Sequence, residues 1–361
     1  MLLYLHIPFC HRVCPYCSFY KHTPGRTPIG GFVAAVVKEA KMRVTEQPRT
    51  LYLGGGTPSM LSPAHLQKLF HCLAEIIDFQ GLDEVTMEAN PATFDERKAE
   101  LFLQLGVRRI SLGIQSFAAG VLQTLGREHD PRQAAEAVRI LQKAGMPEVN
   151  IDLMFSIPGQ TADDWKETLE TAIALQPQHI SAYNLTYEED TAFFENLKRG
   201  GMDENEDRDA DGFHLARRML EEAGFIHYET SNYARAGAES SHNRGYWRGE
   251  DYIGLGPSAV STVARVRTTN VADTAAYISR MNSLGHAADA AEEIGDDAWR
   301  MERIAIGLRT VEGIPGDLLD RKGMETARNL AEHGILEIRG NSVVVTGRGK
   351  ALVDIIAGEL I

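Results

Sequence analysis

The sequence predicts an α/β fold: a partial (β/α)6 TIM-like barrel with a C-terminal winged-helix-like α+β module. Six short apolar runs alternate with amphipathic helical stretches from residue 1 to about residue 190. Crossover helices are what joins parallel strands, so this order indicates a parallel sheet. The tail from about residue 297 reads instead as helices followed by a hairpin. We expect a barrel domain over 1–230, a motif-bearing region and linker over 231–295, and the module over 296–361.

The expected strands are short and apolar, as is typical of a sheet covered on its outer face. They lie at 2–9, 50–56, 84–90, 108–116, 148–159 and 179–188. Two intervening helices have recognisable starts. Asp130 and Pro131 form an N-cap and first-turn pair for a helix that closes at Gly145. Thr161 and Asp164 form a capping-box variant before a second helix.

The remaining segments are less periodic. Residues 204–224 predict a helix, whereas 229–270 are rich in Gly, Ser, Asn and Tyr, and 286–298 suggest a linker or a solvated helix start. In the tail we expect helices at 299–309 and 324–334, then a hairpin over 336–346 that turns at Gly340–Asn341. A winged helix can bind DNA, but the acidic chain favours a module that caps the barrel.

Charge and composition exclude several classes of partner. The 361 residues carry a formal net charge of −13, which repels nucleic acid and anionic lipid. The first residues lack a basic region and a cleavage site, so we expect no signal peptide. No apolar run is long enough to span a bilayer. We therefore expect a cytoplasmic protein, in which thiols stay reduced.

Three of the four cysteines, Cys10, Cys14 and Cys17, follow the spacing C-x3-C-x2-C directly after the first strand. A cytoplasmic cluster of this kind binds metal or is redox-active more often than it is structural. A structural zinc site wants four ligands, and this cluster supplies three. Three thiolates on an iron–sulfur cluster leave one iron open to a further ligand. Cys72 lies in a helical pattern, where a buried core thiol is expected.

Polar residues recur at the carboxyl ends of the following strands. Gly54, Gly55 and Gly56 allow positive φ and close backbone approach to a ligand. Four further polar residues lie at or near later strand ends: Glu88, Gln115, Arg127 and Asp152. Buried charges need partners, so packing alone does not explain this pattern. Carboxylates for an ammonium group and hydroxyls, with an arginine for a carboxylate, suit a zwitterionic ribonucleoside.

The cysteine spacing, with the aromatic Tyr16 before the last thiol, resembles that of the radical S-adenosylmethionine (SAM) superfamily. This resemblance implies a partial barrel of the radical SAM type. It also implies a [4Fe-4S] cluster on Cys10, Cys14 and Cys17, whose fourth iron binds the amino and carboxylate groups of SAM.

The stretches "YLHIPFC" and "IDLMFSIPGQT" further resemble the oxygen-independent coproporphyrinogen III oxidase family, over nearly the whole chain. The resemblance implies that SAM is contacted by Tyr4, Gly55, Glu88, Gln115, Arg127 and Asp152. The residues that match positions around a second SAM in the oxidases are Gly56, Thr57, Thr186 and Val260.

Three features favour the heme-chaperone branch of that family over the oxidases. Phe19 stands where the oxidases carry a fourth cysteine, and the chain starts at the first barrel strand, without their N-terminal extension. "HNRGYW" matches the H-N-x-x-Y-W motif proposed to bind heme in that branch, so His242, Asn243, Tyr246 and Trp247 are candidate heme residues. An imidazole can ligate heme iron and the aromatic rings offer flat surfaces. A core histidine with packed aromatics is the structural alternative.

Three functional hypotheses follow. The first is a heme chaperone, without coproporphyrinogen dehydrogenase activity, that binds heme and passes it to an acceptor protein that the sequence does not identify. The second is a coproporphyrinogen III dehydrogenase that uses a deoxyadenosyl radical. Either implies an electron donor for the cluster, and a homodimer is compatible with both. A zinc-bound interaction module is the third and weakest hypothesis.

Overall fold

Six parallel strands form the centre of the structure, a computed structural model that describes residues 1–361. They are β1 (Leu2–Ile7), β2 (Thr50–Gly55), β3 (Glu84–Ala89), β4 (Arg109–Gln115), β5 (Glu148–Phe155) and β6 (His179–Asn184), paired in sequence order. The predicted partial barrel is confirmed. All six predicted strands are present, each with its carboxyl end at the same edge of the sheet.

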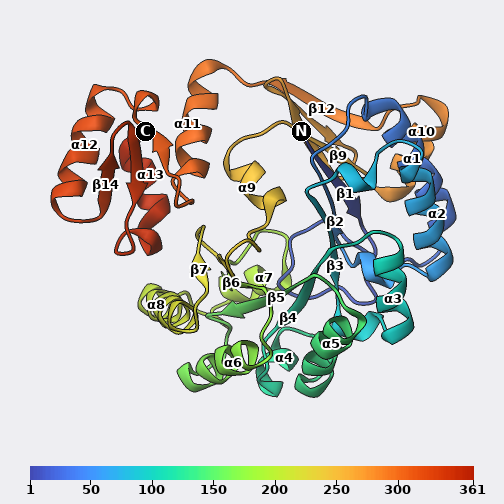
Figure 1. Ribbon diagram of the computed structural model, residues 1–361, viewed down its shortest axis with the longest axis horizontal. Helices are drawn as coiled ribbons and strands as arrows, with labels where there is room; N and C mark the ends of the chain where they lie inside the picture. The colour runs from blue at the N-terminus through green and yellow to red at the C-terminus, as the bar shows by residue number, and fades with distance from the viewer.

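Helices cover the outer face of this sheet, as Figure 1 shows. They are α1 (Ile29–Arg43), α2 (Pro63–Ala74), α3 (Glu96–Gln104), α4 (Ala119–Thr124), α5 (Pro131–Ala144), α6 (Ala162–Ala174) and α8 (Glu206–Glu222). α7 (Ala192–Lys198) packs instead on the cysteine loop, where the ring of Phe193 contacts that of Tyr16. Both predicted helix starts are confirmed: Asp130 and Thr161 each form a capping box. Gly145 closes α5 at a φ of 86°, a conformation that costs glycine little. The apolar strand residues and the inner helix faces share one core of 52 buried residues.

The sheet continues on both sides beyond the six strands. β7 (Ile226–His227) and β8 (Asn232–Ala234) extend it antiparallel beyond β6. β9 (Tyr252–Leu255) pairs parallel with β1, and β10 (Val260–Val263), β11 (Val266–Asn270) and β12 (Ala288–Glu293) follow in antiparallel order. α9 (Ser241–Trp247) and α10 (Thr274–Ser283) lie between these strands in the chain. One twelve-stranded sheet therefore runs past residue 230 to residue 293.

The prediction of a linker or helix start over 286–298 is wrong for most of its length. Residues 288–293 form the edge strand β12, and every one of its side chains is exposed. A strand exposed on both faces needs no apolar alternation, so the sequence "ADAAEE" carried no strand signal. It is held by backbone pairing with β11.

The C-terminal module agrees with the prediction in its helices and hairpin. It contains α11 (Asp296–Gly307), β13 (Ile314–Pro315), α12 (Arg321–Glu332), β14 (Leu336–Arg339), β15 (Ser342–Val345) and α13 (Val353–Leu360). Its three strands form a separate sheet, over a separate core of 12 buried residues. Figure 1 shows the module beside α9 and β7. Its contacts to the barrel include an ion pair from Glu312 to Arg248 and a hydrogen bond from Lys350 Nζ to the carbonyl oxygen of His227 (2.9 Å).

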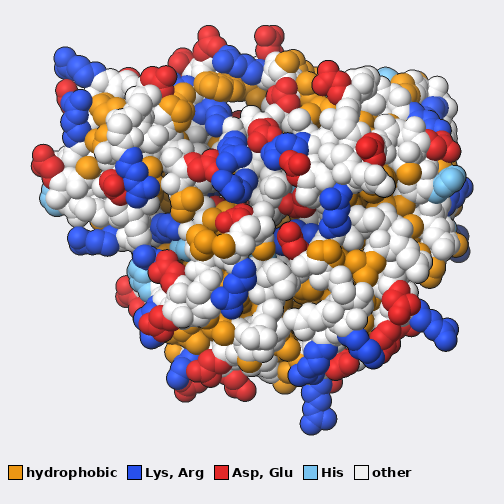
Figure 2. Space-filling view, in the orientation of Figure 1, with side chains coloured by type: hydrophobic (Ala, Val, Ile, Leu, Met, Phe, Trp, Pro, Cys, Tyr) orange, Lys and Arg blue, Asp and Glu red, His pale blue; other side chains and the backbone are white.

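On the face shown in Figure 2, acidic and basic side chains are interspersed rather than gathered into a field of one sign. This is consistent with the module acting as a cap on the barrel. No helix combines the length and the apolar character that a membrane crossing requires.

Candidate functional site

The loop that carries the three cysteines begins directly after β1. The Cys10 amide donates to the carbonyl oxygen of His22 (3.0 Å), and the His22 amide donates to that of Pro8 (2.8 Å), so the loop is closed at its base. Cys10, Cys14 and Cys17 are half-buried free thiols that line one side of a cavity of about 520 Å³. This is the carboxyl end of the barrel, where such folds assemble their active sites.

Donors and a cation surround the thiols. Thr57 Oγ1 donates to Cys10 Sγ (3.4 Å), and Arg127 Nη1 lies 3.6 Å from Cys14 Sγ. Lys21 Nζ donates to the carbonyl oxygen of Cys17. Burial raises the pKa of the Cys10 and Cys17 thiols, so without a metal they are neutral. An electropositive surround of this kind stabilises thiolates once a metal is bound.

The donor set fits an iron–sulfur cluster better than a single ion. No three His, Cys, Asp or Glu side chains in the chain converge on one point in the way a single metal ion requires. In a [4Fe-4S] cluster each thiolate binds a different iron, so the sulfur atoms need not meet. The donors around Cys10 and Cys14 can hydrogen-bond thiolate sulfur.

Opposite the thiols, the cavity wall carries the polar residues predicted from the strand ends. Glu88 accepts hydrogen bonds from Tyr52 Oη (3.0 Å) and from the Gly55 amide (3.1 Å). Asp152 accepts from Ser111 Oγ (2.8 Å) and from Asn150 Nδ2 (2.7 Å). Both carboxylates face the cavity. Burial, and then the charge of Asp152, raise the pKa of Glu88 to about 7.

This pKa makes the stability of the SAM-free protein depend on pH. When a carboxyl has a higher pKa in the folded than in the unfolded state, the folded protein loses stability as the pH rises from the unfolded pKa to the folded pKa. We expect Glu88→Gln to stabilise the protein by about 1–3 kcal/mol at about pH 9 and to gain little at about pH 5. Denaturant titrations at both pH values test this. Glu100→Gln, on the exposed surface of α3, is the control and should keep the pH dependence of stability of the wild type. If Glu88→Gln stabilised the protein equally at both pH values, the raised pKa of Glu88 would be contradicted.

Gln115 and Arg127 complete this wall. Gln115 ends β4 with a φ of 73° at a register shift against β5, a conformation that costs a non-glycine residue about 1–3 kcal/mol. Arg127 donates to the carbonyl oxygen of Gly113, and its buried Nε has no partner. The strain and the unpaired donor lie side by side on the cavity wall, as expected of a ligand site.

Most predicted SAM residues meet at this cavity, and two do not. Those that line it are Gly55, Gly56, Thr57, Glu88, Gln115, Arg127, Asp152 and Thr186. Tyr4 lies behind the wall, with its hydroxyl 3.0 Å from His6 Nδ1 and its ring against Tyr52. Val260 lies on β10, paired with Thr269, away from the cavity. Gly55 has a φ of 101°, and a Cβ there would lie 2.4 Å from the His6 ring, so this position requires glycine.

The motif helix α9 contacts the opposite end of the barrel. Thr50 and Glu84, the first residues of β2 and β3, bind its amino end. His242 Nδ1 lies 2.7 Å from Thr50 Oγ1, and its ring stacks on Tyr52 at 4.9 Å. His242 is 1% exposed, and burial lowers its pKa to about 3. The predicted heme residue thus has a buried, neutral imidazole that does not line the cavity beside the thiols, and its Nε2 has no partner.

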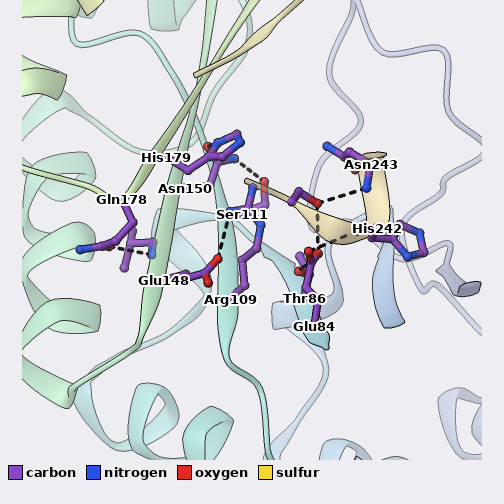
Figure 3. A network of polar contacts seen from close by, with 12 residues as sticks. Glu84, Thr86, Arg109, Ser111, Glu148, Asn150, Gln178, His179, His242 and Asn243 are labelled. Atoms are coloured by element: carbon purple, nitrogen blue, oxygen red, sulfur yellow. Dashed lines mark hydrogen bonds and ion pairs between the residues drawn. The ribbon is translucent and has the colours of Figure 1, made fainter. Parts of the chain in front are cut away.

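A buried polar network joins α9 to Asp152 on the wall opposite the thiols, called the cofactor wall below. Figure 3 shows two parts of it, the contact between Asn150 and His179 and the contacts of Glu84 with the start of α9. The side-chain nitrogen of Asn150 donates to Asp152. The side-chain oxygen of Asn150 is therefore left to accept from His179 Nδ1 (2.6 Å). His179 Nε2 then accepts from Tyr228 Oη (2.8 Å), which accepts from the Ser240 amide (3.2 Å). The carboxylate of Glu84 accepts from Ser240 Oγ and from the His242 amide. The motif helix and the cofactor wall are therefore held in one hydrogen-bonded frame.

Comparison with known proteins assigns this architecture to a family. Residues 4–172 match the radical SAM superfamily. The heme chaperone HemW of Lactococcus lactis is 32% identical, over 96% of this chain and 91% of its own length. The HemW proteins of Bacillus subtilis and Escherichia coli are 30% and 37% identical, over 99% and 71% of this chain and 98% and 68% of their own lengths. The chain belongs to the HemW family.

The HemW fold seen here is shared with an enzyme. The structure of coproporphyrinogen III oxidase (HemN) from Escherichia coli superposes with a TM-score of 0.86 at 21% identity, over 99% of this chain and 89% of that one. At this identity the likeness concerns the fold alone. Membership of the radical SAM superfamily implies a [4Fe-4S] cluster and SAM as cofactors, and the cavity described above supplies three thiols and a polar wall to hold them.

Sequence reasoning missed several residues of this HemW cavity. Tyr52, Ser111 and Tyr183 line it, all on strands whose carboxyl-end neighbours were predicted. Tyr52 and Tyr183 could have been found, because each lies one to three residues before the carboxyl end of its strand and bears a polar group. Lys21 lines the cavity from the cysteine loop, where no periodic signal exists.

Proposed function

We propose that this protein binds heme and passes it to an acceptor protein, while its radical SAM site holds a [4Fe-4S] cluster and SAM. One observation carries the proposal. The "HNRGYW" helix α9, whose motif is the candidate heme site, is joined through buried hydrogen bonds to Asp152 on the wall of the cofactor cavity. The relatives named as heme chaperones, similar over nearly the full length of both chains, support it.

The residues would divide the work as follows. Cys10, Cys14 and Cys17 would hold the cluster, which supplies one iron without a protein ligand. Glu88 and Asp152 face the space beside it with carboxylate oxygens suited to an ammonium group or ribose hydroxyls, and Arg127 offers a cation for a carboxylate. At the other end of the barrel, His242, Asn243, Tyr246 and Trp247 would form the heme site.

Axial ligation by His242 would require its ring to leave the place it has in this structure. The imidazole is held by Thr50 Oγ1 and packed between Tyr52 and Tyr246. Its Nε2 is the unpartnered nitrogen, so the ring has a free lone pair or donor for a ligand. Neutrality at physiological pH leaves the imidazole competent to ligate iron.

Hemin titration of the cluster-loaded protein under anaerobic conditions tests the proposal. We expect saturable binding by the wild type and at least about ten-fold weaker binding by His242→Ala. Thr50→Val is the matched variant, because it removes the hydrogen bond to His242 but keeps the imidazole, and it should bind hemin. Heme-loaded protein should then lose its heme to a hemoprotein acceptor in a soluble extract.

Incubation with coproporphyrinogen III, SAM and a reductant separates this function from that of the oxidases. We expect no fluorescent protoporphyrin after oxidation of the product. Its formation at turnover rates would establish an enzyme and refute the chaperone assignment.

A further inference from the structure

A second cavity, of about 390 Å³, lies between α9, the turn from β7 to β8 and the end of α11. Its wall is formed by Tyr183, Glu229, Thr230, Ser231, Asn232, Asn243, Tyr246, Trp247 and Arg309. Tyr183 also lines the cofactor cavity, so one side chain separates the two spaces. The C-terminal module forms one side of this cavity: Thr310 pairs with Glu229, and the Val311 amide donates to the carbonyl oxygen of Tyr228 (3.1 Å).

Three buried polar atoms of this wall make no hydrogen bond of normal geometry: Trp247 Nε1, Glu229 Oε2 and Asn232 Oδ1, although Asn232 and Trp247 lie close enough to Glu229 to favour its charged form. Glu229 and Asn232 are 1% and 3% exposed. An unpaired buried donor or acceptor costs free energy that a ligand can recover. The wall therefore presents a donor and acceptors to an occupant that can pair with both.

The charges of the wall favour a carboxyl group as that occupant. Arg309 is its one cation, and its guanidinium lies 5.9 Å from the centre of the Trp247 ring. Burial raises the pKa of Glu229 to about 7, so near neutral pH this carboxyl can hold a proton and donate it. A carboxylate could accept from Trp247 Nε1, from Arg309 and from protonated Glu229. An ammonium group could donate to Glu229 and Asn232, but it would also face the charge of Arg309 and leave Trp247 Nε1 without an acceptor.

We propose that this cavity binds a carboxylate side chain of the porphyrin, with Trp247 Nε1 and Arg309 as its donors and Glu229 as its neighbouring acid. The site rests on the proposed function, because it presupposes that heme binds at the motif helix. Trp247 and Tyr246 belong both to this wall and to "HNRGYW", so a tetrapyrrole lying on their rings has its side chains within reach of the cavity. The volume suits one side chain and its water better than a whole macrocycle.

Paired titrations with hemin and with hemin dimethyl ester test the proposal, since the ester keeps the ring and the iron but lacks both carboxylates. We expect the wild type to bind hemin at least about ten-fold more tightly than the ester. Trp247→Phe, which keeps an aromatic ring without the N–H, and Arg309→Gln should each bring this ratio toward one. If either residue were only structural, its substitution would weaken the binding of hemin and of the ester equally and leave the ratio of their affinities unchanged.

Asp354→Asn is the matched control. It removes the ion pair between Asp354 and Arg309 but keeps the guanidinium, so the ratio of the wild type should persist. Equal affinity of the wild type for hemin and its ester would overturn the carboxylate site while leaving heme binding intact. Failure of the wild type to bind either ligand would refute the proposed function itself, and the site with it.

Discussion

Cys14→Ser should abolish the iron–sulfur cluster, whereas Cys72→Ser should leave it intact. Cys14 lines the cofactor cavity beside Arg127 Nη1, whereas Cys72 lies on α2 and does not line that cavity. Cys72 is half-buried rather than the fully buried core thiol that the sequence predicts. A serine hydroxyl is a poor iron ligand, and a cluster left with two thiolates loses its third protein anchor.

Iron and acid-labile sulfide analysis after anaerobic reconstitution measures this effect. We expect the wild type and Cys72→Ser to hold about four irons per chain and Cys14→Ser to hold fewer than about one. Circular dichroism of all three proteins controls for folding. Equal iron in Cys14→Ser and in the wild type would show that the three-cysteine loop does not hold the cluster.

Glu84→Ala should be the most destabilising single substitution in the buried network. Glu84 is 6% exposed and accepts hydrogen bonds from Thr86 Oγ1 (2.6 Å), Ser240 Oγ (3.1 Å) and the His242 amide (3.2 Å). Its charge also faces Arg109, a 2% exposed guanidinium whose Nε and Nη1 have no hydrogen-bond partner. Removing Glu84 leaves the buried Arg109 with Glu148 as its remaining carboxylate neighbour, 3.9 Å away.

We therefore expect Glu84→Ala to lose about 3–5 kcal/mol of unfolding free energy. Glu75→Ala, which breaks a surface pair with Lys41, should lose less than about 1 kcal/mol. Urea titrations of the cluster-free proteins, followed by far-ultraviolet circular dichroism, measure both. A loss for Glu84→Ala no larger than that of Glu75→Ala would mean that the network does not anchor α9.

The parallel sheet made much of the cofactor site predictable. Once six strands with crossover helices are recognised, residues at their carboxyl ends must converge at one edge. This placed Glu88, Gln115 and Asp152 around the cysteine loop, and the structure confirms that they share a cavity. The helix boundaries at Asp130 and Thr161 were predictable for a different reason, because a capping box is a local signal.

Long-range pairing was not predictable in the same way. Nothing local in "YIGL" shows that β9 joins β1, and the exposed β12 has no apolar alternation. The second cavity depends on how the C-terminal module docks, so Arg309 carried no signal in the sequence. The burial of His242 follows from contacts with β2 and β3 that are distant in the chain.

We propose that three thiolates leave one iron of the cluster open to SAM in the cavity walled by Glu88, Gln115, Arg127 and Asp152. Electron paramagnetic resonance of the reduced, reconstituted protein, recorded with and without SAM, tests this arrangement most directly. We expect SAM to shift the g values of the cluster in the wild type and the shift to be weakened in Asp152→Asn. A spectrum of the wild type that is identical with and without saturating SAM would contradict it.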